Sequence, residues 1–285
     1  KAVRKVGVPD IIHAHFYSIA AIASVIKKKK NIPFFITEHS SKLNKDKSLI
    51  SELDKDLTAK AYSHADTVIA VSKALSINLK NNFDIDNVVV HDIVDVDNYH
   101  YVKNNNNQHF NFISVGNLIH LKGFDLLINA FNKAFANDNN VFLNIVGDGI
   151  ERDNLQSLIN QYDINDRAKL LGQKSRAELC NIIRESDAFV LASRSETFGV
   201  VYVEAMACGL PVIATRCGGP EDFVNDDNGV LIPVDDIDAL ANAMIDMRYN
   251  IDKYDGMSIS KECYDKFSPK SIANEIVRYY DKVLK

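Results

Sequence analysis

The sequence predicts an α/β protein built from parallel sheets and divided into two domains. Short apolar runs alternate with longer segments of helical periodicity along almost all of the 285 residues, and this alternation is typical of parallel sheets covered by helices. The polar run Asn104 to Gln108 has no apolar period, so we expect a linker there. The length suits two domains of ordinary size. The predicted boundaries are 1–103 for the first domain, 104–109 for the linker, 110–268 for the second domain and 269–285 for a C-terminal helix.

The first domain begins in mid-pattern. A parallel α/β domain usually opens on a strand followed by a Gly-rich turn, and the residues after Lys1 do not show this opening. We therefore expect the start of the domain to be missing. The expected strands are 11–16, 34–38, 67–71 and 87–91, and the expected helices are 18–30, 49–64 and a short helix capped by Ser72.

The second domain resumes the alternation at Phe110. Its expected strands are 110–116, 141–146, 168–172, 187–192, 211–215 and 229–232, and its expected helices are 124–135, 151–162, 176–185, 237–248 and one that contains Glu204. Pro269 starts a last helix that runs to Leu284, because apolar residues follow it at helical spacing.

Residues 187–222 are the centre of the functional prediction. They encode a strand, a loop, a helix and a second strand, with Glu196 expected in the loop and Glu204 expected in the helix, so that seven residues separate the two. The loop leaves the carboxyl end of its strand, where open α/β sheets bind ligands. Both carboxylates are therefore expected to face one crevice. The simpler alternative is that both are solvated charges, which is the usual state of such residues.

Thr197, Phe198 and Gly199 place backbone N–H groups at the start of the same helix, where an anion is favoured and glycine permits its close approach. A carboxylate beside a phosphate site repels the phosphate unless it binds another part of the ligand. Sugar hydroxyls are the natural partners of an ionised carboxylate, which only accepts hydrogen bonds. The crevice is therefore predicted to bind sugar, phosphate and sugar in series, as in a nucleotide sugar.

The run E-T-F-G-V-V-Y-V-E-A-M-A-C-G-L-P-V-I-A-T, with G-G further on, resembles the signature of the retaining glycosyltransferases of family 4, which have the GT-B fold. The resemblance implies two Rossmann-like domains whose parallel sheets face a central cleft. It also implies that Glu204 binds the ribose hydroxyls, that Glu196 binds the hydroxyls of the transferred sugar, and that the N–H groups around Phe198 and Gly199 hold the diphosphate. In the resembling family the last helix crosses back to the first domain.

Lys122 is the second candidate for the diphosphate site. It precedes a helix in the run G-N-L-I-H-L-K-G, and a cation at this positive end of a helix is unfavourable by ~0.3–1 kcal/mol. Such a placement favours a functional role over a solvated lysine. The resembling family has an arginine and a lysine that grip the diphosphate after the same glycine, here Gly116. Asn117 stands at the arginine position, so either Lys122 carries more of the charge or another residue replaces the arginine.

His13 and His15 alternate along one expected strand and so share a face. The resemblance implies that His15 points at the transferred sugar or the reaction centre, whereas His13 is expected to be a packed, hydrogen-bonded residue. His39 ends the next strand and could line the same cleft. Two further loops, Gly147 to Gly149 and Gly172 to Lys174 with Gln173, lie around the donor in the resembling family. Each is also explained as a turn that glycine favours.

A metal site is not expected. Asp95 and Asp97 imitate the D-x-D pair that some glycosyltransferases use to hold a divalent ion, but their surroundings resemble a turn of the same family, with Asp92 where asparagine is usual. No His, Cys and carboxylate cluster has metal-ligand spacing. We predict no cofactor and a UDP-sugar or GDP-sugar donor.

Composition limits the partners and the compartment. A net charge of −5 argues against nucleic acid as the main partner. The four cysteines form no C-x-x-C pair, which favours reduced thiols and a cytoplasmic setting. The apolar stretch Ile19 to Ile26 is too short to cross a bilayer. Lys27 to Lys30 suit a solvated helix end, and peripheral contact with the inner face of a membrane is the alternative.

The sequence as a whole predicts a retaining, metal-independent glycosyltransferase of the hexosyltransferase type. It would move a sugar from a nucleotide-diphosphate sugar to a saccharide or lipid-linked acceptor in cell-surface polysaccharide or glycolipid synthesis. A nucleotide-sugar 2-epimerase and a non-catalytic nucleotide-sugar-binding fragment remain as alternatives. The predicted catalytic residues are Glu196, Lys122 and His15, and the predicted donor-binding residues are Gly116, Asn117, Lys122, Gln173, Glu196, Thr197, Phe198, Gly199 and Glu204.

Overall fold

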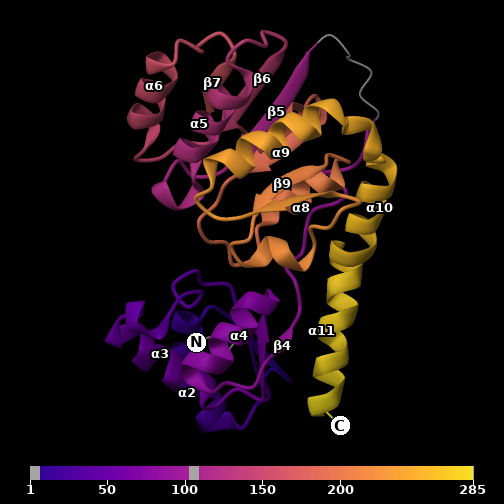
Figure 1. Cartoon of the computed structure of the whole chain (residues 1–285). Helices are drawn as coiled ribbons and strands as arrows, with labels where there is room; N and C mark the ends of the chain where they lie inside the picture. The colour runs from indigo at the N-terminus through magenta and orange to yellow at the C-terminus, as the bar shows by residue number, and fades with distance from the viewer. Residues whose placement is uncertain (1–6, 103–108, 285) are drawn as a thin grey trace. The chain divides into compact units, whose positions relative to one another are not determined.

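The computed structural model describes residues 7–102 and 109–284, which form two compact units (Figure 1). The first unit runs to Asp92 and includes the C-terminal segment from Lys270, and the second runs from Ile93 to Pro269. The predicted linker at 104–109 lies, apart from His109, outside the described residues. The boundary between the two units lies before the predicted linker. Val94 already belongs to the second unit, where its backbone N–H donates to the carbonyl of Phe267 at 3.0 Å.

The first unit contains a four-stranded parallel sheet in the order β1-β2-β3-β4. The inner strand β2 is buried along its whole length, as is typical of a strand covered on both faces of a parallel sheet. Ser51 and Ser72 cap the helices that follow them, since each hydroxyl accepts a backbone N–H of the first turn. The elements are β1 (Ile12–His15), α2 (Tyr17–Lys30), β2 (Phe34–Glu38), α3 (Glu52–Tyr62), β3 (Thr67–Ala70), α4 (Lys73–Phe83) and β4 (Val88–Val89).

The last helix, α11 (Pro269–Leu284), belongs to the first unit from Lys270 onwards. Its buried residue Ile272 packs with Ile69 and Val90. Its Tyr280 hydroxyl forms a hydrogen bond of 2.5 Å with His13 Nδ1. The amphipathic spacing in the sequence therefore corresponds to a face that packs on the sheet of this unit.

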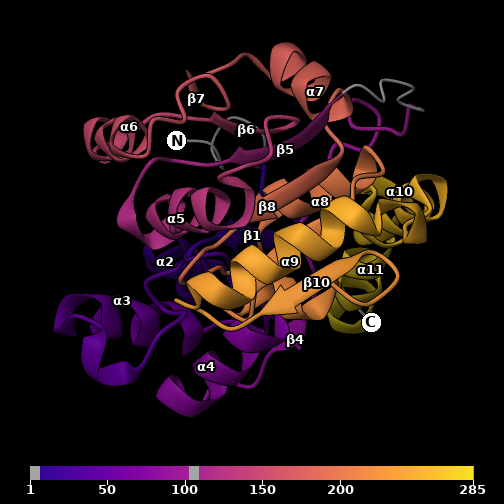
Figure 2. The same cartoon turned by 45° about the horizontal axis from the view of Figure 1, so that its top comes forward.

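The second unit contains a six-stranded parallel sheet in the order β10-β9-β8-β5-β6-β7, and α5 and α9 pack side by side over it (Figure 2). Its strands are β5 (Phe110–Val115), β6 (Val141–Val146), β7 (Ala168–Gly172), β8 (Ala188–Leu191), β9 (Val212–Thr215) and β10 (Gly229–Ile232). Its helices are α5 (Phe124–Phe135), α6 (Arg152–Gln161), α7 (Arg176–Arg184), α8 (Val200–Ala207), α9 (Ile237–Tyr249) and α10 (Gly256–Phe267).

The strand order of the second unit determines where a ligand site can form. From β5 the chain builds outwards through β6 and β7, and then returns to place β8 on the other side of β5. This reversal is a topological switch point, and open α/β sheets bind ligands at the carboxyl ends of the strands at such a point. Residues 116–123 follow β5 and residues 192–199 follow β8.

Helix α10 was absent from the sequence prediction. Its buried residues Ile259, Cys263 and Phe267 recur every four positions, but the segment opens on Gly256 and is otherwise polar, which hides this short period. The helix is held to α8 by hydrogen bonds from Ser260 Oγ to the Ala207 carbonyl, at 2.6 Å, and from the Cys263 thiol to the Val203 carbonyl.

All four cysteines are free thiols. Within residues 7–102 and 109–284, none of the helices is both long enough and apolar enough to span a bilayer.

Candidate donor-binding site

Tight backbone packing fixes the loop after β5. Gly123 has a φ of 65°, and a side chain there would place its Cβ 1.9 Å from the carbonyl oxygen of Ala192, at the end of β8. Gly147 has a φ of 142°, and its Cβ would lie 1.9 Å from the Gly116 carbonyl oxygen. Only glycine fits these positions. The glycines therefore allow three loops to approach one another, which is the conformational role that the sequence analysis offered for Gly147.

Lys122 and Glu196 meet across the switch point. Lys122 Nζ lies 2.6 Å from Glu196 Oε1, and the Ser193 hydroxyl donates to the same oxygen at 2.7 Å. Glu196 is only 7% exposed. Its backbone is fixed as well, because its N–H donates to Cys217 and its carbonyl accepts from Gly219. The pair therefore places a lysine and a carboxylate, with their charges balanced, at the edge of the sheet where a ligand would bind.

This pairing was not anticipated. The resemblance assigned Lys122 to the diphosphate and Glu196 to the sugar, as independent groups, whereas in the structure each is a hydrogen-bond partner of the other. Ser193 was missed too, although its position next to Glu196 in the loop was available from the sequence. An ammonium group has three donors, so the bond to Glu196 leaves Lys122 able to donate to an anion.

Arg194 holds the two loops together and was also missed. Its guanidinium makes a bidentate pair with Asp125, at 2.9 and 2.8 Å, and its Nε donates to Asp235 at 2.7 Å. Its Nη1 also donates to the carbonyl of His120 at 2.5 Å. Arg194 therefore links the Lys122 loop to the loop after β8 through bonds to Asp125, Asp235 and His120.

The turn that leads into α8 is anchored by a buried aromatic side chain. Phe198 is 2% exposed, and its ring packs edge-on against Phe223 and Phe267. Gly199, with a φ of 96°, then turns the chain into the helix, where a Cβ would lie 2.8 Å from the Tyr202 ring. A side chain at Gly219 would likewise meet the Phe198 carbonyl oxygen at 2.2 Å. Phe198 therefore offers only its backbone to a ligand, while its side chain anchors the turn in the core.

Glu204 lies on α8 in a different environment from Glu196. Burial raises the pKa of Glu204 to about 7, although Arg176 and a hydrogen bond from Tyr99 act in the opposite direction. Arg176 in turn pairs with Asp95 at 3.0 Å. The sequence analysis did not predict Tyr99 and Arg176 as partners of Glu204. It assigned residue 99 to the first domain. The two glutamates therefore have separate sets of partners.

The remaining predicted donor residues lie at carboxyl ends of strands. Asn117 follows β5 and Gln173 follows β7, and both side chains are exposed. Thr197 is half-buried in the loop after β8. The residues described contain no group of three or more His, Cys, Asp or Glu side chains placed to hold a metal ion. Asp95 of the D-x-D sequence is instead bonded to Asn98 as well as to Arg176.

Three histidines of the first unit, His13, His15 and His39, cluster at the ends of β1 and β2. His13 is held by Thr37, at 2.7 Å, and by Tyr280, which confirms its expected structural character. Burial, followed by repulsion from His15 and His39, lowers the pKa of His13 to about 4. His15 is exposed, and its Nδ1 lies 2.9 Å from His39 Nε2. His39 and His15 are therefore hydrogen-bonded to each other, a contact that the sequence analysis did not predict.

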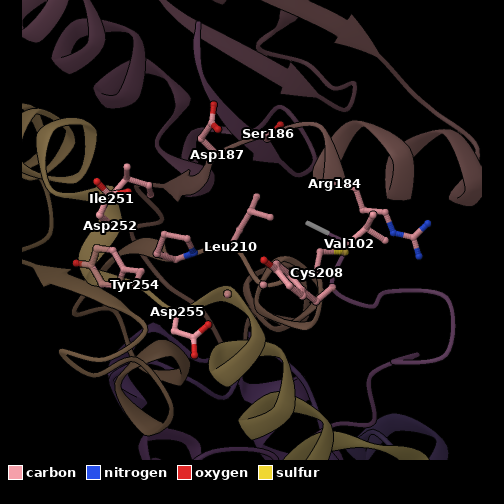
Figure 3. Close-up of a pocket in the computed structure, with 14 residues that line it drawn as sticks. Val102, Arg184, Ser186, Asp187, Cys208, Leu210, Ile251, Asp252, Tyr254 and Asp255 are labelled. Atoms are coloured by element: carbon pink, nitrogen blue, oxygen red, sulfur yellow. The ribbon is translucent and has the colours of Figure 1, made fainter. Parts of the chain in front are cut away.

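A separate cavity of about 380 Å³ lies at the opposite edge of the second unit's sheet, where β8 and β9 begin (Figure 3). Asp187 and Leu210, which precede these two strands, line it together with Tyr254 and Asp255. None of the predicted site residues lines this cavity. It is thus distinct from the carboxyl-end site.

The two units, each built on a parallel sheet covered by helices, have the Rossmann-like architecture expected of the GT-B fold. The chain belongs to the family described as glycosyl transferases group 1, whose model matches residues 95–258. The description of the model that matches residues 1–98 is glycosyltransferase family 4. Both matches agree with the resemblance found in the sequence.

Individual relatives support the same assignment. The chain is 28% identical over 277 residues to an uncharacterized glycosyltransferase of Methanocaldococcus jannaschii, covering 96% of this chain and 76% of the relative. It is 29% identical to N-acetyl-alpha-D-glucosaminyl L-malate synthase of Bacillus anthracis, covering 97% and 75%.

Solved structures share the fold. Sucrose-phosphate synthase from Thermosynechococcus elongatus superimposes with a TM-score of 0.87 at 22% identity, covering 99% of this chain and 75% of the other. The Anabaena protein HepE in complex with UDP gives a TM-score of 0.85 at 20% identity, covering 99% and 81%.

Proposed function

We propose that this glycosyltransferase is a retaining hexosyltransferase that uses a nucleoside-diphosphate sugar without a metal ion. Its acceptor would be a saccharide or a lipid-linked saccharide, in polysaccharide or glycolipid synthesis. The observation that carries the proposal is the Lys122–Glu196 pair, 2.6 Å apart at the switch point of the second unit, because it offers a cation for a phosphate and a carboxylate for sugar hydroxyls at one place.

The names of similar proteins support the chemical class of both substrates. HepE is described in complexes with UDP and with UDP-glucose. A Corynebacterium glutamicum relative, 32% identical over 137 residues, is named as a GDP-mannose-dependent mannosyltransferase acting on a phosphatidylinositol monomannoside. A Rhizobium meliloti relative, 34% identical over 133 residues, is named for lipopolysaccharide core biosynthesis. These names favour a nucleotide-sugar donor and a glycan or glycolipid acceptor, and they leave the base open between uracil and guanine.

In the proposed mechanism, the residues of this chain stabilise the departing diphosphate. Lys122 and the backbone N–H groups at Thr197 to Gly199 donate to it as negative charge develops there. Glu196 accepts from the hydroxyls of the transferred sugar, and Glu204 accepts from those of the ribose. The leaving phosphate then takes the acceptor's proton on the same face of the sugar, so that retention needs no enzymic nucleophile. We assign His15 to the reacting sugar, as the resemblance implies.

The first test is nucleotide binding. UDP or GDP at saturating concentration should raise the melting temperature by mass action, by an amount that grows with the logarithm of ligand concentration. ADP, which carries a different base, is measured for comparison. If none of the three nucleotides shifts the transition, the donor-site assignment is wrong.

The second test distinguishes sugar transfer from epimerisation and from binding alone. Labelled UDP-sugars and GDP-sugars are incubated with and without saccharide or lipid-linked acceptors, in the presence and absence of EDTA. Transfer that requires an acceptor and survives EDTA supports the proposal, and an α-linked product from an α-linked donor establishes retention. Conversion of the donor without an acceptor would instead indicate an epimerase, and binding without conversion would indicate a binding protein.

A further inference from the structure

A chain of hydrogen bonds runs from Asp92 through His39 to His15 within the first unit. Asp92 Oδ1 lies 2.9 Å from His39 Nδ1, and His39 Nε2 lies 2.9 Å from His15 Nδ1. The two ring planes are inclined by 21°, with centroids 5.2 Å apart, so the rings lie edge to edge, as a hydrogen bond between ring nitrogens requires. The contact follows from the sheet, because His15 ends β1 and His39 immediately follows the neighbouring strand β2.

The chemistry of these atoms fixes where the protons lie. A carboxylate only accepts hydrogen bonds, so His39 Nδ1 must carry a proton and donate it to Asp92. In neutral His39 the other nitrogen, Nε2, is then an acceptor, and His15 Nδ1 must donate to it. Neutral His15 is left with a lone pair on Nε2. Protonation of His39 reverses this order, because its Nε2 then donates to His15 Nδ1 and the proton of His15 moves to Nε2.

We propose that Asp92 and His39 are positioning residues that hold His15 as the Nδ1–H tautomer, so that His15 Nε2 accepts a hydrogen bond from a substrate hydroxyl. That the hydroxyl belongs to a sugar rests on the proposed glycosyltransferase function. The tautomer itself does not depend on that function, because it follows from contacts within the first unit.

The surroundings hold the rings in place. Phe16 has a φ of 64°, which is rare and costly for a bulky residue and typical of functional sites, and its ring packs on His39 with centroids 5.0 Å apart. The buried carboxylate of Glu38 accepts the backbone N–H of His39 at 3.0 Å and also binds Tyr62. The backbone and the ring of His39 are therefore both fixed.

The charged and titratable neighbours favour a neutral His15. Burial is the main cause that lowers the pKa of His15, repulsion from His39 adds to it, and Asp92 opposes both. His13 stacks on the other side, with ring centroids 4.9 Å apart, and its own pKa is lowered to about 4. Near pH 7, His15 is thus an acceptor through Nε2.

Asparagine at position 92 removes this control. The amide of Asp92→Asn can accept from His39 Nδ1 through its oxygen or donate to it through its nitrogen. Donation forces the proton of His39 to Nε2 and the proton of His15 to Nε2 as well, which turns the substrate-facing acceptor into a donor. The variant has almost the same shape, so the change isolates hydrogen-bond direction from packing.

The direct test is ¹⁵N NMR of the imidazole rings at pH 7.5, on the wild-type protein and on Asp92→Asn. The wild type should show a protonated Nδ1 and a pyridine-like Nε2 at His15, and Asp92→Asn should shift His15 towards the Nε2–H form. Asp56→Asn, which removes an exposed carboxylate from α3, is the control and should leave His15 unchanged. A wild-type His15 protonated at Nε2 overturns the proposal. So does an Asp92→Asn protein in which His39 carries its proton on Nε2 while His15 keeps its proton on Nδ1.

The second readout is turnover. Asp92→Asn should lower kcat about tenfold, the effect of losing one hydrogen bond to a hydroxyl, with little change in KM for the nucleotide donor. His39→Gln should lower kcat similarly, and Asp56→Asn should not. Full turnover by Asp92→Asn despite a shifted tautomer would contradict the role of His15 Nε2. Absence of transfer by the wild type would count against the proposed function alone, since the NMR result would stand.

Discussion

The raised pKa of Glu204 predicts that this residue destabilises the fold at alkaline pH and that Glu204→Gln relieves the cost. Burial raises its pKa from 4.5 to about 7. At one pKa unit per 1.36 kcal/mol, the ionised carboxylate costs up to about 3 kcal/mol in the folded state. Glutamine has nearly the same shape and no charge, so it keeps the packing on α8 and removes the penalty.

The sign of the pH dependence follows from the direction of the shift. Between pH 4.5 and 7 the unfolded chain has released the proton of Glu204 while the folded protein still binds it. The contribution to stability is therefore fully present below pH 4.5 and declines as the pH rises to about 7. Relative to the wild type, Glu204→Gln should gain stability over this interval and keep its advantage above pH 7.

Urea unfolding at pH 5, 6, 7 and 8 measures this difference. Glu178→Gln is a matched control, because hydrogen bonds from Ser175 lower the pKa of Glu178 in the capping box of α7. That variant should lose stability relative to the wild type above pH 5, the opposite trend. If the wild-type and Glu204→Gln free energies of unfolding run parallel from pH 5 to 8, Glu204 is not a buried, destabilised carboxylate and the reasoning fails.

Two further predictions concern the loops at the switch point. Lys122→Met should destabilise the fold by about 1–3 kcal/mol, between the values for exposed and buried ion pairs, and the Lys122→Met/Glu196→Gln double variant should recover part of this loss in a thermal double-mutant cycle. Additive changes in the free energy of unfolding would show that the pair is not coupled. Turnover should fall strongly in both variants. Gly147→Ala should destabilise the second unit by at least about 1 kcal/mol, because its Cβ would overlap the Gly116 carbonyl. An unchanged melting temperature would contradict that contact.

The sequence was sufficient for most elements of the second unit. The bounds of α5, β6, β7 and β10 were predicted as they are found, and the boundaries of β8 and α7 differ at their ends only. These segments have either clear helical periodicity or short apolar runs between turns. Helix α10 lacked both signals. Strand β4 is only Val88–Val89, because pairing with β3 at the sheet edge ends earlier than the apolar run 87–91.

The candidate site was predictable as a set of residue types but not as a set of contacts. Glu196 and Lys122 were identified from their loops, yet their ion pair depends on β5 and β8 being neighbours. The sequence does not show this pairing, because three α-helices and two strands separate β5 from β8 along the chain. The same limit applies to Tyr99 beside Glu204, because a contact between residue 99 and α8 requires the division of units to fall at Asp92.

The ion pair also bears on the missing arginine. Asn117 brings no charge to the site, and the charge of Lys122 is balanced by Glu196 at 2.6 Å, so we expect a free nucleoside diphosphate to bind, but less tightly than it would bind beside an unpaired lysine. A sugar whose hydroxyls donate to Glu196 stabilises the carboxylate by other bonds and lets Lys122 turn more of its donors to the phosphate. In this arrangement the intact donor has an advantage over the free nucleotide, because the sugar and the diphosphate each satisfy one member of the pair.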